Sequence, residues 1–300
     1  MPKVKSNEPE SLQPYLSHGI DLSWGKGDKD AIGTCPWCDK PGKFYVNLVK
    51  GTWRCWVCGE GNEKGGGNSQ VFIELLWKKS KELTTTKMLK ELADERGYDD
   101  TKTLVAWGIC KSILTGEWLV PGFDRDGNIR TVYRRGANGT LYPTKTLGHW
   151  IHGANLYRKG RKKVIWCEGP WDGMAIYETL GKISTTAFEP APNALKSMRK
   201  LYNVLAAPGC ETLDEKWLKL FKGKEVLIAF DNDHPRKHSK TGKEMEPAGW
   251  KAVQRISPMI SRVAKKVEYI KWGEDEYYDL SLPNGCDVRD WLVKDGIAPS

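Results

Sequence analysis

The sequence of 300 residues lacks the long apolar segments that mark membrane and secreted proteins. No run approaches the roughly 20 apolar residues that span a bilayer, and VLIAF at residues 226–230 is typical of the longest. The opening stretch, MPKVKSNEPE, contains no apolar signal core. We therefore expect a cytoplasmic protein without a membrane partner.

Two further absences narrow the function. The pattern G-x-x-x-x-G-K-[ST] does not occur, which excludes a P-loop and a motor domain built on one. No secretion signal accompanies the eight cysteines, and because the cytosol keeps thiols reduced, a disulfide framework is not expected. Four cysteines are scattered along the chain and are predicted to be small core residues: Cys110, Cys167, Cys210 and Cys286.

The other four cysteines form two closely spaced pairs. Cys35-Pro-Trp-Cys38 and Cys55-Trp-Val-Cys58 are separated by sixteen residues, and each pair offers two thiolates to one ion. Structural Zn²⁺ takes four such ligands in a tetrahedron, with no position left for a substrate. The spacing predicts one structural zinc ion, with unrelated thiols or two redox pairs as the weaker alternatives. The metal alone does not distinguish binding of nucleic acid, binding of protein and simple stabilisation of a small fold.

The charge balance favours a polyanionic partner. The chain carries 47 Lys and Arg residues against 38 Asp and Glu, a formal net charge of +9. An excess of this sign suits nucleic acid or an acidic membrane surface, and it also occurs in proteins that are merely soluble. Charge therefore leaves the partner open.

The predicted elements change character along the chain. Residues 70–79, QVFIELLWKK, have the apolar spacing of a helix. Residues 119–135, LVPGFDRDGNIRTVYRR, predict a β-hairpin around Asp126-Gly127. After residue 152, strand-like runs alternate with helical ones, which is typical of a parallel sheet covered by helices.

Acidic residues follow two of these predicted strands. VIWCE ends on Glu168, with Asp172 four residues further on, and VLIAF runs into Asp231-Asn232-Asp233. Because open parallel sheets bind ligands beyond the carboxyl ends of their strands, Glu168, Asp231 and Asp233 are predicted to share one crevice. Clustered carboxylates repel one another, and a divalent cation that prefers oxygen ligands would neutralise them. Such a site suits phosphoryl or nucleotidyl transfer, although either motif alone would be ordinary loop chemistry.

These motifs resemble the Toprim domain, which DnaG-type primases share with topoisomerases and some nucleases. The resemblance lies in CEGPWDGMA, with Glu168 and Asp172, and in IAFDND, with Asp231 and Asp233. In that family these acids bind the catalytic divalent ions, Mg²⁺ or Mn²⁺.

A third motif is similar but altered. In LPNGCDVRDWLVKDG, Asp287 matches the first acid of a primase segment that follows the last strand, and the resemblance implies a further magnesium ligand there. Arg289 stands at the position of the second acid, and Asp290 follows one residue later. The displacement leaves the role of Asp290 open.

The middle of the chain narrows the resemblance to DnaG-type and bacteriophage DNA primases. WLVPGFDRDGNIRTVYRR is similar to the amino-terminal half of the primase polymerase domain, and HGANLYR to the segment just before its Toprim domain. A four-cysteine ribbon ahead of both is the bacteriophage arrangement. The resemblance spans residues 35–296 and places the protein in the cytoplasm of a bacterial host if it is viral.

Several side chains are predicted to contact nucleic acid or nucleotide. The set is Arg134, Arg135, Lys145, His152, Trp53 and Trp56. The two arginines match the family motif, whereas Lys145 and His152 correspond only loosely to basic positions of the family. The tryptophans could stack on template bases, with stabilisation of the ribbon as the alternative.

A polar, basic segment departs from the family pattern. HPRKHSKTGKEMEP, residues 234–247, separates the paired aspartates from Ala248-Gly249, which follow them almost directly in typical primases. We expect a surface loop at the rim of the crevice, which either grips nucleic acid or is tolerated without a role.

The predicted fold class is α/β: a small β zinc ribbon joined to an α+β polymerase subdomain and a Toprim domain with a parallel sheet flanked by helices. We expect the ribbon at residues 1–66, the basic subdomain at 67–160 and the Toprim domain at 161–300. The resemblance implies a DNA primase that joins ribonucleoside triphosphates on single-stranded DNA, with Glu168, Asp231 and Asp233 catalytic. A non-catalytic zinc/Toprim nucleic-acid-binding protein and a Toprim nuclease are the alternatives, and a separately encoded replicative helicase remains an open partner.

Overall fold

The computed structural model describes residues 9–27, 29–62, 65–182, 198–209, 212–237, 239, 241–274 and 277–288. Three residues considered above, Cys210, Arg289 and Asp290, lie outside these ranges. Within the described ranges, no helix has both the length and the apolar character needed to cross a membrane.

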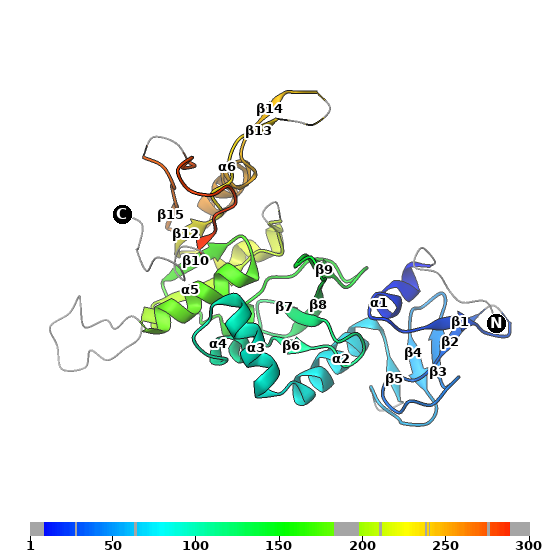
Figure 1. Cartoon of the computed structure of the whole chain (residues 1–300). Helices are drawn as coiled ribbons and strands as arrows, with labels where there is room; N and C mark the ends of the chain where they lie inside the picture. The colour runs from blue at the N-terminus through cyan, green and yellow to red at the C-terminus, as the bar shows by residue number, and fades with distance from the viewer. Residues whose placement is uncertain are drawn as a thin grey trace, which may run out of the picture. The chain divides into compact units, whose positions relative to one another are not determined.

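The chain divides into two compact units, each assembled from several segments (Figure 1). Unit 1 comprises Met1–Leu89, Gly108–Gly122 and Ile129–Trp150, and unit 2 comprises Lys90–Trp107, Phe123–Asn128 and Ile151–Ser300. The domain boundaries expected at residues 66 and 160 stay a prediction.

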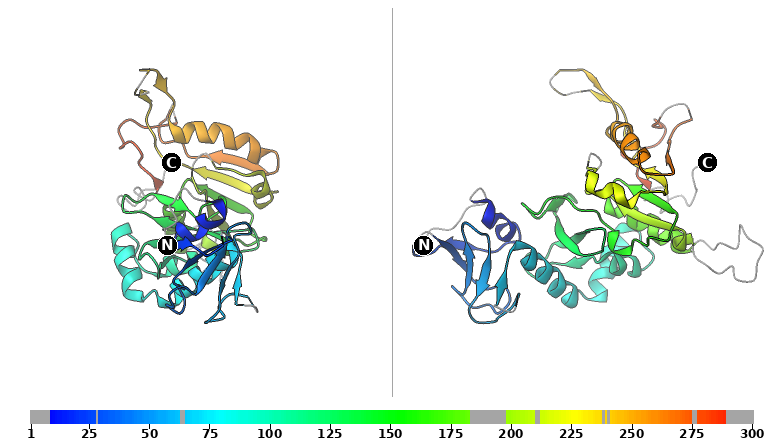
Figure 2. Two further views of the ribbon diagram at one scale, coloured as in Figure 1. Left: turned by 90° about the vertical axis from the view of Figure 1, so that its right-hand side faces the viewer. Right: turned by 180° about the vertical axis from the view of Figure 1, so that it is seen from behind.

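Unit 1 contains two β-sheets, and the first is the predicted ribbon (Figure 2). Its antiparallel strands lie in the order β1-β2-β3-β4-β5, which are Leu22–Trp24, Asp30–Gly33, Phe44–Asn47, Trp53–Cys55 and Gly66–Gly67. The short helices η1 (Glu10–Leu12) and α1 (Gln13–Leu16) precede them. The Tyr15 hydroxyl donates to the Gly51 carbonyl at 2.5 Å, which ties this first segment to the turn between β3 and β4.

The second sheet of unit 1 has the order β6-β7-β8-β9, which are Cys110–Lys111, Trp118–Phe123, Ile129–Arg135 and Leu141–Pro143. Strands β7 and β8 enclose the Asp126-Gly127 turn, which confirms the predicted hairpin. Helix α2 (Ser69–Leu83) contacts β6 and β8 of this sheet and β5 of the ribbon. It begins at Asn68, whose side chain accepts a hydrogen bond from the Val71 N–H at 3.0 Å. Its buried apolar residues are Phe72, Ile73 and Leu76.

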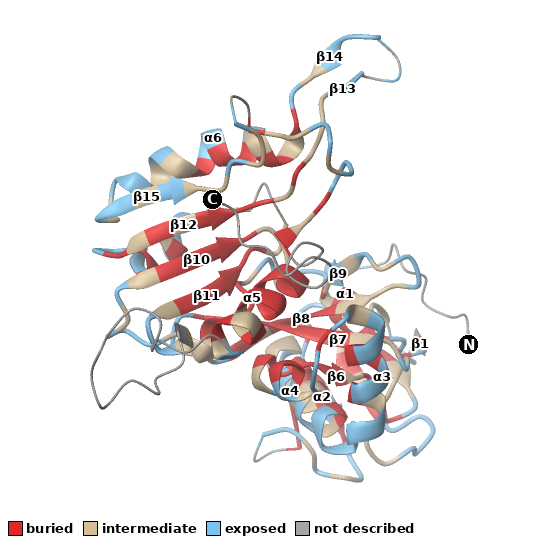
Figure 3. Cartoon of the chain, turned by 60° about the vertical axis from the view of Figure 1, so that its left-hand side comes forward, coloured by how far each residue is buried: buried red, intermediate tan, exposed pale blue. Residues whose placement is uncertain are grey.

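Unit 2 is built on a four-stranded parallel sheet with the order β11-β10-β12-β15. The strands are Lys163–Cys167 (β10), Tyr202–Ala206 (β11), Glu225–Ala229 (β12) and Lys266–Tyr269 (β15). Figure 3 shows β10 and its two neighbours buried, and β15 exposed at the edge. Since a parallel strand is covered on both faces, the continuous apolar runs of β10 and β12 fit this position.

Helices cover both faces of this sheet, as predicted. One face is covered by η5 (Glu215–Leu220) and by Phe221, which follows it. The Trp166 ring centroid lies 5.3 Å from that of Phe221 and 6.3 Å from that of Trp217. On the other face lies α5 (Pro170–Lys182), where a Cβ on Gly173 would stand 3.2 Å from the Ala206 Cβ. Cys167 is the register partner of Ala206, so its side chain points to the α5 face.

Unit 2 contains several further elements. Helix α6 (Ala248–Ser261) leads to β15, and the strands β13 (Arg236–Lys237) and β14 (Glu244–Met245) precede it. The other described helices are α3 (Thr86–Arg96, which begins in unit 1), α4 (Lys102–Trp107), η2 (Ala154–Leu156) and η4 (Met198–Lys200). The chain passes from β10 to β11 on one side and then returns to β12 on the other, so the order reverses between β10 and β12.

Candidate functional site

The carboxyl ends of β10 and β12 carry the acidic residues. Cys167 and Ala229 are register partners in these adjacent parallel strands, so Glu168 and Asp231, which follow them closely, leave the sheet at the same edge. The Asp231 N–H donates to Glu168 Oε2 at 3.4 Å. The two residues therefore meet at the point where the strand order reverses, which is where sheets of this kind bind ligands.

Five carboxyl groups at this edge influence one another. Burial first, and then the charges of Glu168, Asp172, Asp287 and Asp233, raise the pKa of Asp231 to about 10. A carboxyl group with such a pKa is protonated at neutral pH, unless a cation offsets the neighbouring charges. Asp231 therefore interacts electrostatically with each of the other four predicted magnesium ligands, and their binding of a cation stays a prediction.

Asp172 lies in the first turn of α5 and is buried, with 7% of its surface exposed. Gly169 precedes this helix, and a Cβ there would stand 3.2 Å from Asp172 Oδ2, so the carboxylate packs closely against the backbone. A helix N-terminus favours a negative charge, which helps to explain how an acid is kept in a buried place.

Asp233 is held by the first turn of α6. The Gly249 N–H donates to Asp233 Oδ2 at 2.7 Å. A Cβ on Gly249 would stand only 2.9 Å from the Asp231 carbonyl oxygen, so the helix approaches the acidic strand end this closely because residue 249 is glycine.

Asn232, which lies between the two aspartates, was not among the predicted site residues. It is fully buried, and its side chain both donates to the Asp279 carbonyl at 2.9 Å and accepts from the Asp279 N–H at 2.8 Å. Its backbone N–H donates to the Cys286 carbonyl at 2.8 Å. These bonds fix the segment that carries Asp287 against the end of β12.

The four cysteines of the ribbon form the second candidate site, which lies in unit 1. The Cys35 and Cys58 sulfurs are 3.7 Å apart, and those of Cys38 and Cys55 are 3.8 Å apart. Sulfurs bound to one tetrahedral Zn²⁺ at about 2.3 Å stand about 3.8 Å from one another. Disulfide sulfurs would be about 2.05 Å apart, so the cluster fits a zinc ion, as predicted.

The thiols of this cluster differ in how readily they ionise. Burial opposes ionisation of Cys55, but hydrogen bonds from the N–H groups of Cys58 and Val57 and from the Cys35 and Cys58 side chains lower the Cys55 pKa to about 7. Burial raises the pKa of Cys35 and of Cys58. The Val57 N–H donates to the Cys55 sulfur at 3.4 Å. Among the described residues, only these cysteines bring three or more potential ligand atoms all within 4.8 Å of one another.

The two ribbon tryptophans have different surroundings. Trp53 is 2% exposed, and its ring stacks on Phe44 with centroids 5.4 Å apart, so it stabilises the ribbon and cannot present its face to a base. Trp56 is 62% exposed, and the Arg54 guanidinium lies 3.7 Å from its ring centroid. Only Trp56 keeps the surface that stacking on a base requires.

The predicted basic contacts are also placed unequally. His152 is fully buried, and its backbone exchanges two hydrogen bonds of 3.1 Å with Ala206 at the edge of the parallel sheet, so its burial does not support the predicted contact with nucleic acid. Lys145 is exposed, whereas Arg134 and Arg135 are half-buried at the end of β8. Arg134 forms an ion pair with Glu117 at 2.8 Å, and an anion would compete with it.

Comparison with known proteins gives similarity to solved structures alone. No family model matches the sequence, and no curated protein sequence matches it. The zinc-binding and RNA polymerase domains of the Aquifex aeolicus primase align with a TM-score of 0.47 at 15% identity, over 96% of this chain and 83% of that chain. The RNA polymerase domain of Mycobacterium tuberculosis primase DnaG aligns with a TM-score of 0.48 at 14% identity, over 75% of this chain and 80% of that chain. The primase fragment of the bacteriophage T7 primase-helicase protein aligns with a TM-score of 0.42 at 16% identity, over 79% of this chain and 88% of that chain.

Replacing Cys38 by Ser should release the zinc ion and destabilise the ribbon, because the small sheet β1–β5 is closed by that ion. Zinc content by atomic emission should fall from about one ion per chain to near zero, and limited proteolysis should become faster within residues 22–67. Cys110→Ala, a buried thiol outside the cluster, is the control and should keep its zinc. Full zinc content in the Cys38→Ser protein would contradict the assignment.

Replacing Asp231 by Asn should stabilise the metal-free protein at pH 8. Because folding raises this pKa from 3.8 to about 10, the stability tied to the protonated carboxyl is complete below pH 3.8 and is lost as the pH rises toward 10. We expect the Tm of the Asp231→Asn protein to exceed that of the natural protein by about 2–4 °C for each kcal/mol added to the free energy of unfolding. This difference in Tm should disappear near pH 4.

The same variant should respond less to magnesium. Adding Mg²⁺ should raise the Tm of the natural protein and have little effect on the Asp231→Asn protein, as measured by differential scanning fluorimetry. Glu91→Gln, which removes an exposed acid in α3, is the control. Equal responses to Mg²⁺ in all three proteins would show that the ion does not bind at these acids.

Proposed function

We propose that the protein is a DNA primase, a nucleotidyltransferase that joins ribonucleotides on a single-stranded DNA template with the help of Mg²⁺ or Mn²⁺. The observation that carries this proposal is the meeting of Glu168 and Asp231 at the reversal point of the parallel sheet, with Asp172, Asp233 and Asp287 beside them. A cluster of carboxyl groups this close requires protons or cations to neutralise it.

The reaction needs groups that bind nucleotide phosphates and accept a proton. The 3′-hydroxyl oxygen of the growing primer bonds to the α-phosphorus of the incoming triphosphate, the bond from that phosphorus to its bridging oxygen breaks, and pyrophosphate leaves. Divalent ions held by Glu168, Asp231 and Asp233 would activate the attacking oxygen and stabilise the leaving one. Asp172 and Asp287 would complete the set of ligands around them.

Glu168 is our candidate for the acceptor of the hydroxyl proton. It stands directly at the end of β10, and its carboxylate lies over the end of β12, where it accepts the Asp231 N–H. A general base must lie within hydrogen-bond reach of the proton that it removes. A substrate hydroxyl bound at the shared rim of the two strands would lie within this reach of Glu168.

Unit 1 would supply the template contacts. The zinc ion would keep the ribbon folded, and the Trp56 ring with the Arg54 guanidinium beside it would offer a stacking surface and a positive charge to single-stranded DNA. Arg134, Arg135 and Lys145 are proposed phosphate contacts. A Toprim nuclease would use the same acids, and the products of the reaction distinguish the two activities.

Replacing Glu168 by Gln should reduce primer synthesis about 100-fold or more, because it removes a metal ligand or the proton acceptor without changing the size of the side chain. The assay combines labelled ribonucleotides, single-stranded DNA and Mg²⁺, and scores short RNA products against degradation of the template. Template binding, followed by fluorescence anisotropy, should be nearly unchanged. The control is the exposed Glu91→Gln.

Three results would contradict the proposal. Full synthesis by the Glu168→Gln protein would remove Glu168 from the mechanism. Template degradation by the natural protein, without RNA products, would replace the primase by a nuclease, and DNA binding without either activity would leave a non-catalytic binding protein.

A further inference from the structure

The segment between Asp233 and Gly249, expected from the sequence to be a surface loop, contains a short β-hairpin. Strands β13 and β14 pair antiparallel, with Arg236 opposite Met245 and Lys237 opposite Glu244. Figures 1, 2 and 3 show the two strands extending beyond α6, away from the parallel sheet of unit 2. The insertion is therefore a projecting element of the same unit that carries the acids.

Both ends of this hairpin are fixed to the acidic site. On the outgoing side, the His234 N–H donates to Asn284 Oδ1 at 2.7 Å, close to the segment that carries Asp287. On the returning side, the chain enters α6, whose Gly249 N–H holds Asp233 at 2.7 Å. The stems therefore stand at the rim of the carboxylate cluster.

The described surface of the hairpin is polar and mainly positive. Its exposed cations are Arg236, Lys237 and Lys243. Its one exposed acid on a strand, Glu244, is the register partner of Lys237 and is partly balanced by it. None of the exposed side chains described between residues 236 and 245 is apolar. A surface without apolar side chains does not suit a protein partner, and its charge suits phosphates.

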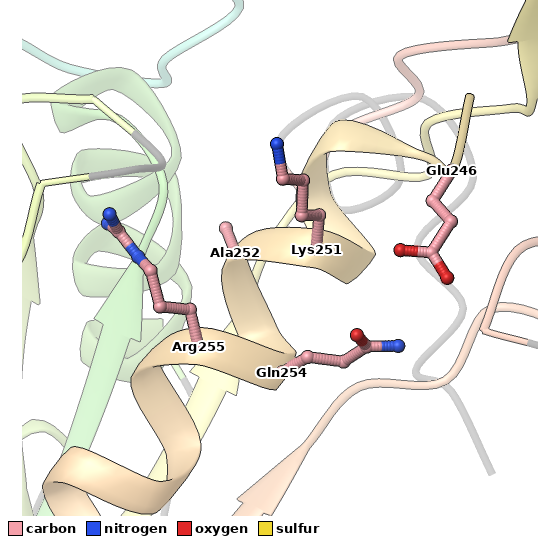
Figure 4. Close-up of a pocket in the computed structure, with 5 residues that line it drawn as sticks. All are labelled: Glu246, Lys251, Ala252, Gln254 and Arg255. Atoms are coloured by element: carbon pink, nitrogen blue, oxygen red, sulfur yellow. The ribbon is translucent and has the colours of Figure 1, made fainter.

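The positive surface continues onto α6. Lys251 and Arg255 lie four residues apart, on the same face of the helix. Together with Gln254, Ala252 and Glu246 they line an open hollow of about 530 Å³ (Figure 4). Figure 4 shows the Lys251 and Arg255 side chains on one side of this hollow and Glu246 on the other. Because Glu246 adds a negative charge to this hollow, the hollow is less positive than the surface of the hairpin.

We propose that the β13–β14 hairpin binds the sugar-phosphate backbone of single-stranded DNA as the strand enters the acidic site. This inference rests on the proposed function for the identity of the strand. The carboxylates repel a polyanion, and a hairpin that projects from their rim carries cations that would attract the strand toward the site. Contacts of this kind are independent of sequence and weaken with salt.

The test neutralises the three hairpin cations in the full-length protein with Arg236→Gln, Lys237→Gln and Lys243→Gln. A matched control changes Lys200, Lys219 and Lys222 to Gln; these exposed lysines precede β11 and β12, at the opposite edge of the same sheet. Binding of a fluorescent oligo-dT is measured by anisotropy at several salt concentrations. Oligo-dT is chosen because a backbone contact needs no particular base.

We expect the hairpin variant to bind about 10- to 100-fold more weakly at 0.1 M salt, and its slope of log K against log salt to fall by up to about 2. The estimate takes about 0.7 per phosphate contact on a single strand for three contacts. The control should keep the affinity and slope of the natural protein. Circular dichroism and Tm verify that both variants are folded.

The outcomes separate this inference from the proposed function. Unchanged binding and slope in a folded hairpin variant would overturn the inference, even if the natural protein makes primers. An equal loss in the control variant would also overturn it, because the effect would then be one of net charge. A selective loss of binding in the hairpin variant supports it, even if the natural protein makes no primers. Deleting residues 235–243 gives a second variant for the same measurement.

Discussion

Repulsion between carboxylates at one edge of the parallel sheet is the constraint around which unit 2 is organised. Parallel pairing places the ends of β10 and β12 side by side, so Glu168 and Asp231 have no freedom to separate. Burial and four neighbouring acids raise the pKa of Asp231 to about 10. A fold that keeps such a group is less stable than one without it, and this arrangement is typical of a site that binds cations.

The surrounding residues hold the acids in place against that repulsion. The first turn of α6 binds Asp233 through the Gly249 N–H, and Asn232 fastens the segment of Asp287 with bonds to Asp279 and Cys286. None of these partners carries a positive charge, so they position the carboxylates without neutralising them.

The sequence predicts those parts of the structure that are encoded locally. The apolar runs of β10 and β12 lead directly into acids, and the cysteine pairs have the spacing of a zinc knuckle, so the residues of both candidate sites could be named without coordinates. The burial of Trp53 and His152 could not, because it depends on packing partners elsewhere in the chain. Asn232 bonds to a residue 47 positions away, and the strands of the hairpin, two residues each, are too short to show a period.

The two candidate metal sites differ in how completely the protein surrounds the ion. The four sulfurs already stand at the distances of a zinc tetrahedron, which leaves no position for another ligand. The described carboxylates do not gather three ligand atoms within 4.8 Å, although their charges interact strongly. Mg²⁺ is usually held by one or two carboxylates together with waters and substrate phosphates. The open arrangement therefore fits a site where a bound substrate would supply the missing ligands, and the closed one fits a site that only maintains the ribbon.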